Sequence, residues 1–337
     1  MHHLRGRETV AVVFCLLLLS SSGAATFAQS RETKPVAAQR SVAVTFDDLP
    51  ATSPSADPRA VREMTRTLLG RVTSNRVPAV GFVNEGKLWR NGKADDALVA
   101  TLKMWLDAGL ELGNHTYSHP DLNTTPLDAY QANVVDGEKH TRSLMERKKL
   151  KLRYFRHPFL HAGATPETKR AFEKFIAARG YRVAPVTIDN DEYVYAAVYQ
   201  EAKESGDAQT MRRVAEAYIP YMEVMFEFYE KYSRETLGYE IPQVLLLHAN
   251  ELNADTFDQL AAMMKRRGYR FVTLEEALKD QAYRLPDTYA GRRGLSWLHR
   301  WAVTKGSEKN PQHPSYPDWL QKLYDRREAR LRNSRGR

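Results

Sequence analysis

The sequence has a single cysteine, Cys15, so no intramolecular disulfide can hold the fold together. Cys15 lies inside an apolar run, residues 10–19, which follows two arginines near the start of the sequence. The run is about half of the ~20 residues that a membrane-spanning helix needs, and small residues follow it. Residues 1–28 are therefore predicted to be a secretory signal peptide, with a retained membrane anchor as the alternative. An exported protein without disulfides must depend on an ordinary packed core, which a chain of 337 residues can build.

Two further absences narrow the function. No glycine-rich phosphate loop follows the first predicted strand, residues 42–46. Basic and aromatic residues are not interleaved in the way typical of nucleic-acid binding, so no nucleic-acid partner is expected. The net charge is +9, and residues 322–337 hold seven basic and two acidic side chains. Such a basic tail is typical of a solvated end, or of a segment that touches an anionic envelope polymer.

Short apolar runs alternate with helical patterns from residue 41 onward. The predicted strands are residues 42–46, 79–83, 110–113, 154–156, 182–188, 244–247 and 269–273. The predicted helices are residues 59–73, 94–107, 127–148, 166–179 and 254–267. Alternation of this kind indicates an α/β fold with a mainly parallel sheet. We predict a distorted, possibly incomplete TIM-like barrel over residues 41–283, with a doubly wound sheet as the alternative.

Two segments break the alternation, and residues 29–40 are predicted to be a flexible leader. Residues 194–240 form a helical insertion between the fifth and sixth strands, with an apolar stripe at helical spacing. The stripe predicts a helix packed against the barrel; a second hypothesis is a lid that restricts access to chain ends or short oligomers. Residues 284–337 form a C-terminal extension that ends in the basic tail.

Polar residues fall where the predicted strands end. The strand-end residues are Asp47 and Asp48, Asn114 and His115, Arg156, Asp189, and His248. Because the carboxyl ends of parallel barrel strands open onto one face, these side chains are expected to meet there. That face is where barrel enzymes place their catalytic groups.

The cluster contains the ligand types of a catalytic metal. His115 and His119 are four residues apart, so a helical turn would point both imidazoles the same way. Two histidines and one carboxylate leave a position open for water, as catalytic zinc sites do. Of Asp47 and Asp48, one is expected to ligate the metal and the other to act as the base. The residues alone do not assign the two roles.

Five motifs carry a resemblance to a known family. They are TFDDLP at 45–50, HTYSH at 115–119, RHPF at 156–159, DNDEY at 189–193 and LLLH at 245–248. In this order and at these distances, they resemble the NodB-homology polysaccharide deacetylases, carbohydrate esterase family four. The resemblance covers roughly residues 42–278. It implies a distorted barrel that binds a divalent metal of the zinc type and hydrolyses N-acetyl or O-acetyl groups on a glycan.

The resemblance also assigns roles to single residues. It implies that Asp48, His115 and His119 hold the metal. Asp47 matches the base, Arg156 the arginine that holds the base, and His248 the general acid. Phe159 supplies a backbone N–H to the oxyanion, and Leu246 forms the apolar wall beside the acetyl methyl.

The fourth motif departs from the family pattern, D-x-x-D-W. Glu192 stands where an aspartate would tune the acid histidine, and Tyr193 replaces the tryptophan that lines the groove. Asp189 is the other carboxylate placed to tune His248. In the third motif, His157 and Leu160 also differ from the usual R-P-P-Y-G. These differences indicate a differently shaped sugar site.

The expected function is thus an exported, metal-dependent removal of acetyl groups from a glycan, with no membrane span after signal cleavage. One alternative is a deacylase of a small amide or a non-sugar acyl group, which the altered fourth motif favours slightly. The other alternative is a non-catalytic glycan-binding protein. A binder has no need of both the metal triad and an acid–base pair.

Overall fold

The computed structural model describes residues 40–53, 57–307 and 311–335. All of these residues belong to one compact unit, residues 39–337. The predicted signal peptide, and the leader apart from Arg40, lie outside the described residues. Arg40 itself is the first residue of strand β1. Within the described ranges, no helix is long and apolar enough to cross a membrane.

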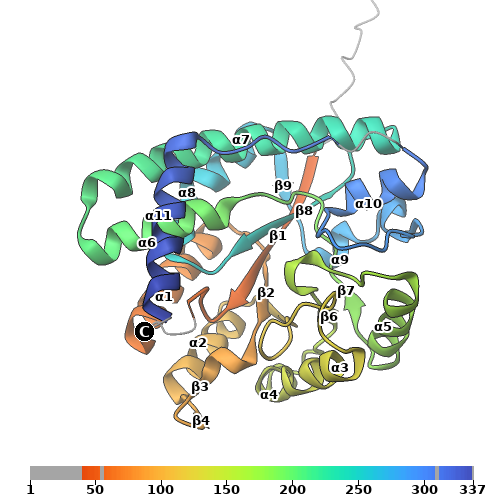
Figure 1. Cartoon of the computed structure of the whole chain (residues 1–337), viewed down its shortest axis with the longest axis horizontal. Coiled ribbons are helices and arrows are strands. Elements are labelled where there is room, and N and C mark those ends of the chain that lie inside the picture. Colours follow the sequence, from red (N-terminus) through yellow and green to blue (C-terminus); the bar gives the residue numbers. More distant parts are fainter. Residues whose placement is uncertain (1–39, 54–56, 308–310, 336–337) are drawn as a thin grey trace, which may run out of the picture. The chain divides into compact units, whose positions relative to one another are not determined.

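Seven parallel strands form one curled sheet around β1 (Figure 1). The strands are β1 (Arg40–Leu49), β2 (Val80–Val83), β5 (Glu111–Asn114), β6 (Tyr154–Phe155), β7 (Arg182–Val183), β8 (Gln243–His248) and β9 (Tyr269–Phe271). The order is β7-β6-β5-β2-β1-β8, and β9 pairs with the start of β1. Strand β1 is buried along most of its length, which its run of apolar residues on both faces predicts.

The two ends of this strand order meet through the segment that follows β7. Ile188 forms a parallel bridge with Leu245 of β8, and the Leu246 N–H donates to the Ile188 carbonyl. The predicted strand 182–188 is therefore a two-residue strand followed by a single bridge. The sheet curls into a distorted barrel, which confirms the predicted fold class.

Helices cover the outside of the sheet. They are α1 (Pro58–Ser74), α2 (Asp96–Asp107), α3 (Leu127–Asp136), α4 (Lys139–Arg147), α5 (Pro166–Ala178), α8 (Glu251–Arg266) and α9 (Leu274–Ala277). The prediction of a single helix over residues 127–148 is wrong, because the helix is interrupted between α3 and α4. Gly137 lies at the break, where a Cβ would overlap the backbone of Thr116. The glycine lets α3 end directly against the loop that carries His115 and His119.

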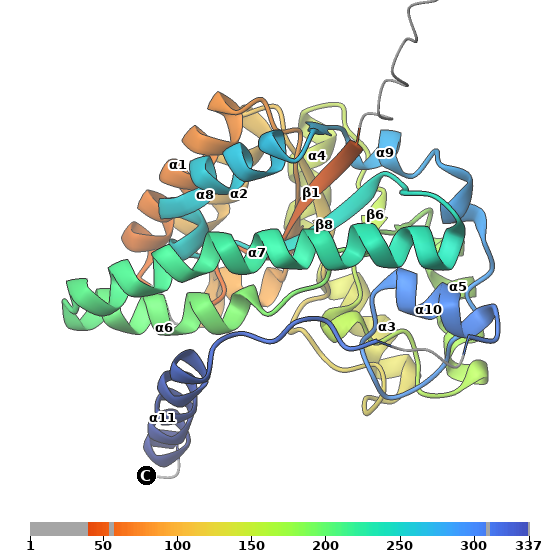
Figure 2. The same cartoon turned by 90° about the horizontal axis from the view of Figure 1, so that it is seen from above.

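The insertion between β7 and β8 is a pair of helices, α6 (Glu192–Ser205) and α7 (Ala208–Leu237). The predicted apolar stripe lies on α7 and is buried, as its spacing requires. It consists of Tyr218, Met222, Met225, Phe226, Tyr229 and Tyr232. The C-terminal extension adds α10 (Trp297–Thr304) and α11 (Asp318–Arg335). In both views of the molecule the axis of α11 crosses the direction of α6 steeply (Figures 1 and 2), and the two helices are in contact.

Candidate active site

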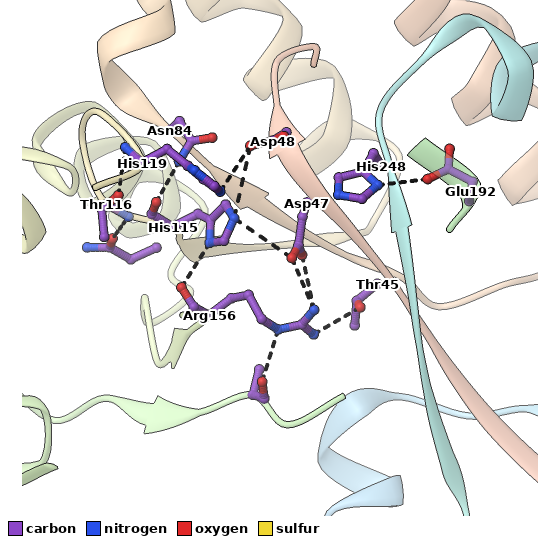
Figure 3. Close-up of polar contacts among 12 residues, drawn as sticks. Thr45, Asp47, Asp48, Asn84, His115, Thr116, His119, Arg156, Glu192 and His248 are labelled. Atoms are coloured by element: carbon purple, nitrogen blue, oxygen red, sulfur yellow. Dashed lines mark hydrogen bonds and ion pairs between the residues drawn. The ribbon is translucent and has the colours of Figure 1, made fainter. Parts of the chain in front are cut away.

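The carboxyl ends of β1, β5 and β8, with the loops after β6 and β7, surround a cleft of about 740 Å³. Its walls include Asp47, Asp48, His115, His119 and His248, together with residues of α6 and α11. The structure thus brings the predicted strand-end cluster together on one face (Figure 3).

Asp48, His115 and His119 converge at one point of this cleft. Each offers a ligand atom, and the three atoms lie within 4.8 Å of one another. The Nε2 atoms of His115 and His119 are 4.0 and 3.9 Å from Asp48 Oδ1. A metal ion can be held by these three residues.

Backbone strain, and not a helical turn, brings the two histidines together. Residues 115–119 form an irregular loop after β5, in which Thr116 and His119 have φ angles of 70° and 58°. Asp48 has a φ of 69°. Left-handed backbone is unfavourable for such residues and collects at functional sites. The expected helical turn is wrong, although the imidazole rings do meet, with centroids 4.8 Å apart.

The protonation states of the triad suit metal ligands. The Nδ1–H of His115 donates to the Arg156 carbonyl at 2.8 Å, which leaves Nε2 directed at the carboxylates. Burial lowers the pKa of both His115 and His119, so both imidazoles are neutral at pH 7. Burial alone would raise the pKa of Asp48, but the charges of Lys87 and of the nearby histidines hold it below its usual range.

Asp47 lies beside these three residues and is hydrogen-bonded to Arg156. The guanidinium Nη1 donates to both Asp47 oxygens at 3.2 Å. Its other nitrogens donate to the Ala184 carbonyl and the Thr45 hydroxyl, at 2.9 and 3.0 Å. Arg156 is fully buried, so its donors are satisfied without water. Burial raises the pKa of Asp47 to about 6, although the charge of Arg156 opposes the rise.

His248 ends β8 directly opposite Asp47 in the strand register. Its Nδ1 lies 2.7 Å from Glu192 Oε2, at the first turn of α6. Glu192 is itself fixed by side-chain amide donors from Asn250 and Asn253. Burial alone would lower the pKa of His248, but the hydrogen bond and charge of Glu192 raise it to about 9.

Asp189, the other carboxylate predicted to tune His248, takes a different position. It lines the cleft, and its Oδ1 accepts the N–H of Asn190 at 3.0 Å. Burial raises the pKa of Asp189 to about 6. Of the two carboxylates, the one that bonds His248 is Glu192.

The three predicted substrate-binding residues all line the cleft. Phe159 and Leu160 have φ angles of 56° and 55°, and the Phe159 ring packs on His119 with centroids 4.4 Å apart. Phe159 is 54 % exposed and Tyr193 46 % exposed, so both present apolar surface to a ligand. Leu246 is buried and lies two residues before His248 on β8.

Comparison with known proteins identifies the family. The family model "Polysaccharide deacetylase" matches residues 34–175. The chain is 26 % identical to the chitin deacetylase of Colletotrichum lindemuthianum over 239 residues, which is 71 % of this chain and 79 % of that protein.

Over residues 34–175 the chain thus matches the polysaccharide deacetylase family. The match and the similar chitin deacetylase indicate a hydrolase of the deacetylase type.

Solved structures of carbohydrate esterase family four are also similar. One is a Bacillus anthracis pseudoenzyme of this family, in a mutant with restored enzymatic activity; it has 19 % identity and a TM-score of 0.46 and covers 72 % of this chain and 68 % of its own. Another is the Streptomyces lividans esterase in complex with acetate, with 19 % identity and a TM-score of 0.43 over 72 % and 97 % of the two chains. At TM-scores below 0.5, the assignment rests on the family match.

The deacetylase family match ends before β7, so Glu192 and His248 lie beyond it. Sequence reasoning also missed three features of the site. Lys87 lies 3.1 Å from Asp48 Oδ1, and Gly294 packs against the Phe159 carbonyl. The third feature is α11, which lines the cleft with Arg327, Glu328 and Leu331.

Proposed function

We propose that this deacetylase is an exported, metal-dependent hydrolase that removes acetyl groups from a glycan. The observation that carries the proposal is that one cleft holds three potential metal ligands together with an Asp47–Arg156 pair and a His248–Glu192 pair. A glycan binder would not need a base and an acid beside a metal triad in the same cleft. Export rests on the predicted signal peptide, residues 1–28.

The residues present fit a divalent cation, and zinc suits the donor set of two imidazoles and one carboxylate. Asp48 Oδ1 is buried and accepts no hydrogen bond within the described part of the chain, although the Lys87 ammonium lies 3.1 Å from it. When bound, the cation supplies Lewis-acid polarisation of the acyl oxygen and makes water more acidic. Asp48, His115 and His119 would hold it.

Asp47 is the base in this proposal. Above its pKa of about 6 it is ionised and can take a proton from the attacking water. The hydrogen bonds from Arg156 Nη1 to both oxygens keep the carboxylate in place and favour its charged form. Asp47 is therefore assigned to proton transfer and Asp48 to the metal.

His248 is the acid in this proposal. With a pKa of about 9 it carries its proton at neutral pH and can donate it to the leaving nitrogen. Since Nδ1 bonds Glu192, the proton that is transferred comes from Nε2. The Phe159 N–H is assigned to the oxyanion and Leu246 to the acetyl methyl, as the resemblance implies.

The first substrates to test are oligomers of β-1,4-linked N-acetylglucosamine, because the curated relative is a chitin deacetylase. We expect acetate release that stops when a chelator removes the metal and returns when Zn²⁺ is added. Acetylated xylo-oligosaccharides test the O-acetyl linkage in parallel. Retention of the oligomers without acetate release, at any Zn²⁺ concentration, would identify a binding protein and refute the proposal.

A further inference from the structure

The C-terminal helix α11 lies at the active-site cleft. Its residues Arg327, Glu328 and Leu331 line the same cavity as Asp48 and His248. Both views show α11 beside α6, whose first turn carries Glu192 (Figures 1 and 2). The basic tail that composition assigns to solvent is therefore in part a cleft wall.

Specific contacts dock α11 on the inserted helices. The Tyr324 ring meets Tyr193 edge to face, with centroids 6.2 Å apart, and Arg330 pairs with Glu201 of α6. At the start of α11, the Arg213 guanidinium lies 3.9 Å from the centroid of the Trp319 ring. Such contacts fix the face that α11 turns toward the cleft.

That face has the chemistry of a sugar-binding surface. Leu331 is 37 % exposed and lies in the same cleft as the exposed Tyr193 ring, which gives an apolar surface for the C–H face of a pyranose. Arg327 and Glu328 form a 2.7 Å ion pair on the same wall. A partly buried pair of this kind offers donors and acceptors to hydroxyl groups, as sites with a few polar groups in an apolar lining do.

The position of α11 determines which sugar it can touch. The acetyl group must lie at the Asp48, His115 and His119 cluster, whereas α11 makes its contacts with Tyr193 and Glu201 of α6. The side chains of α11 therefore face the part of the substrate that extends away from the reacting group.

We propose that α11 is a substrate-binding element of this hydrolase, in which Arg327 and Leu331 contact the sugar next to the one that loses its acetyl group. The inference rests on the proposed function. A substrate-binding α11 makes the enzyme specific for oligosaccharides that are long enough to reach both the reacting sugar and its neighbour.

The test compares substrates of different length. Arg327→Ala and Leu331→Ala should each lower kcat/KM on N-acetylglucosamine oligomers of four to six sugars by about five- to tenfold, mainly through KM. Hydrolysis of 4-nitrophenyl acetate, which has no neighbouring sugar, should not change. Lys322→Ala is the matched control, because Lys322 is exposed on the same helix but does not line the cleft. Circular dichroism checks that each variant is folded.

Equal losses on the ester and the oligomers, or no loss on the oligomers, would overturn the inference. Calorimetric titration of the hexamer gives an independent reading. If no oligomer releases acetate, the proposed function fails for this substrate, but weaker hexamer binding by Arg327→Ala and Leu331→Ala alone would still support the α11 site. Unchanged hexamer affinity in both variants would refute it.

Discussion

Two sides of the cleft are held in place by different kinds of contact. We call them the metal side, with Asp48, His115 and His119, and the acid side, with His248 and Glu192. On the metal side, Asp48 near the end of β1 and His119 in the loop after β5 both have left-handed backbone. On the acid side, His248 ends a regular strand and depends on Glu192, a residue of an inserted helix far away in the sequence. Only the metal side lies within the family match at residues 34–175.

The difference shows which part of the site can vary. Strained loop backbone tolerates few alternatives, because it must place ligand atoms within 4.8 Å of one another. A carboxylate that raises the pKa of the acid histidine needs only to reach its imidazole. A glutamate can do so from a helix that starts farther from the histidine than an aspartate would allow. Glu192 in place of an aspartate, with Asn250 and Asn253 fixing its far oxygen, is consistent with this freedom.

Removing a ligand on the metal side should have the largest effect. Asp48→Ala, His115→Ala or His119→Ala leaves two ligands, so bound zinc and acetate release should both fall to background. Metal analysis after dialysis, together with an acetate assay, checks both. Full zinc content in any of the three variants would remove that residue from the ligand set.

Asp47→Asn separates the two aspartates. The amide is similar in size and can still face Arg156, but it cannot take a proton, so turnover should fall by about 10²–10⁴-fold. Zinc content should equal that of the wild type. Loss of zinc in Asp47→Asn would show that the roles of Asp47 and Asp48 are assigned the wrong way round.

The two sides were not equally predictable from the sequence. Strand ends are local features, so Asp47, Asp48, His115 and His248 could be placed on one face from pattern alone. The choice between Asp189 and Glu192 could not, because both stand close to the end of the same irregular segment. Only the direction in which α6 starts decides that Glu192 reaches His248.

The role of α11 was hidden by its composition. Its many arginines predict a solvated end, yet one stripe of the helix packs inward, and Leu320 on it is fully buried. The spacing of Leu320, Tyr324, Arg327 and Leu331 was the available signal, since three- and four-residue steps indicate one helix face. The lid hypothesis for residues 194–240 stays a prediction; among the described residues, α6 lines the cleft and α7 does not.

Gly294→Ala tests whether the C-terminal extension supports the metal side. A Cβ at this position would overlap the Phe159 carbonyl oxygen, so the strained Phe159 turn must shift. Overpacking of this kind costs about 1–3 kcal/mol of stability, and a displaced Phe159 N–H should lower kcat by about tenfold while KM changes less.

Gly70→Ala is the control for that variant, because a Cβ there has no atom within 4 Å and the residue lies inside α1. It should leave kcat unchanged and raise the stability by about 0.5–1 kcal/mol. If Gly294→Ala has the kcat of the wild type, the contact with Phe159 is packing alone.

Glu192→Gln should have the smallest effect at neutral pH and the clearest effect on pH dependence. The rate should rise with pH as Asp47 ionises. The pKa of Asp47 is about 6 and a bound cation nearby lowers it, so this rise should lie at or below pH 6. It should fall as His248 loses its proton near pH 9. Without the charge of Glu192, burial dominates and lowers the pKa of His248. Because the acid works only below its pKa, the descending limb of kcat/KM should move to lower pH while the ascending limb and the zinc content stay the same.

Asp189→Asn is the matched carboxylate variant for this experiment. Asp189 makes no hydrogen bond to His248 among the described contacts, so its removal should leave the descending limb near that of the wild type. A shift in Asp189→Asn but not in Glu192→Gln would transfer the tuning role to Asp189. If neither variant moves the descending limb, no carboxylate sets the pKa of His248. The two sides of the cleft would then not differ as proposed, with local backbone placing the metal ligands and a charge distant in the sequence tuning the acid.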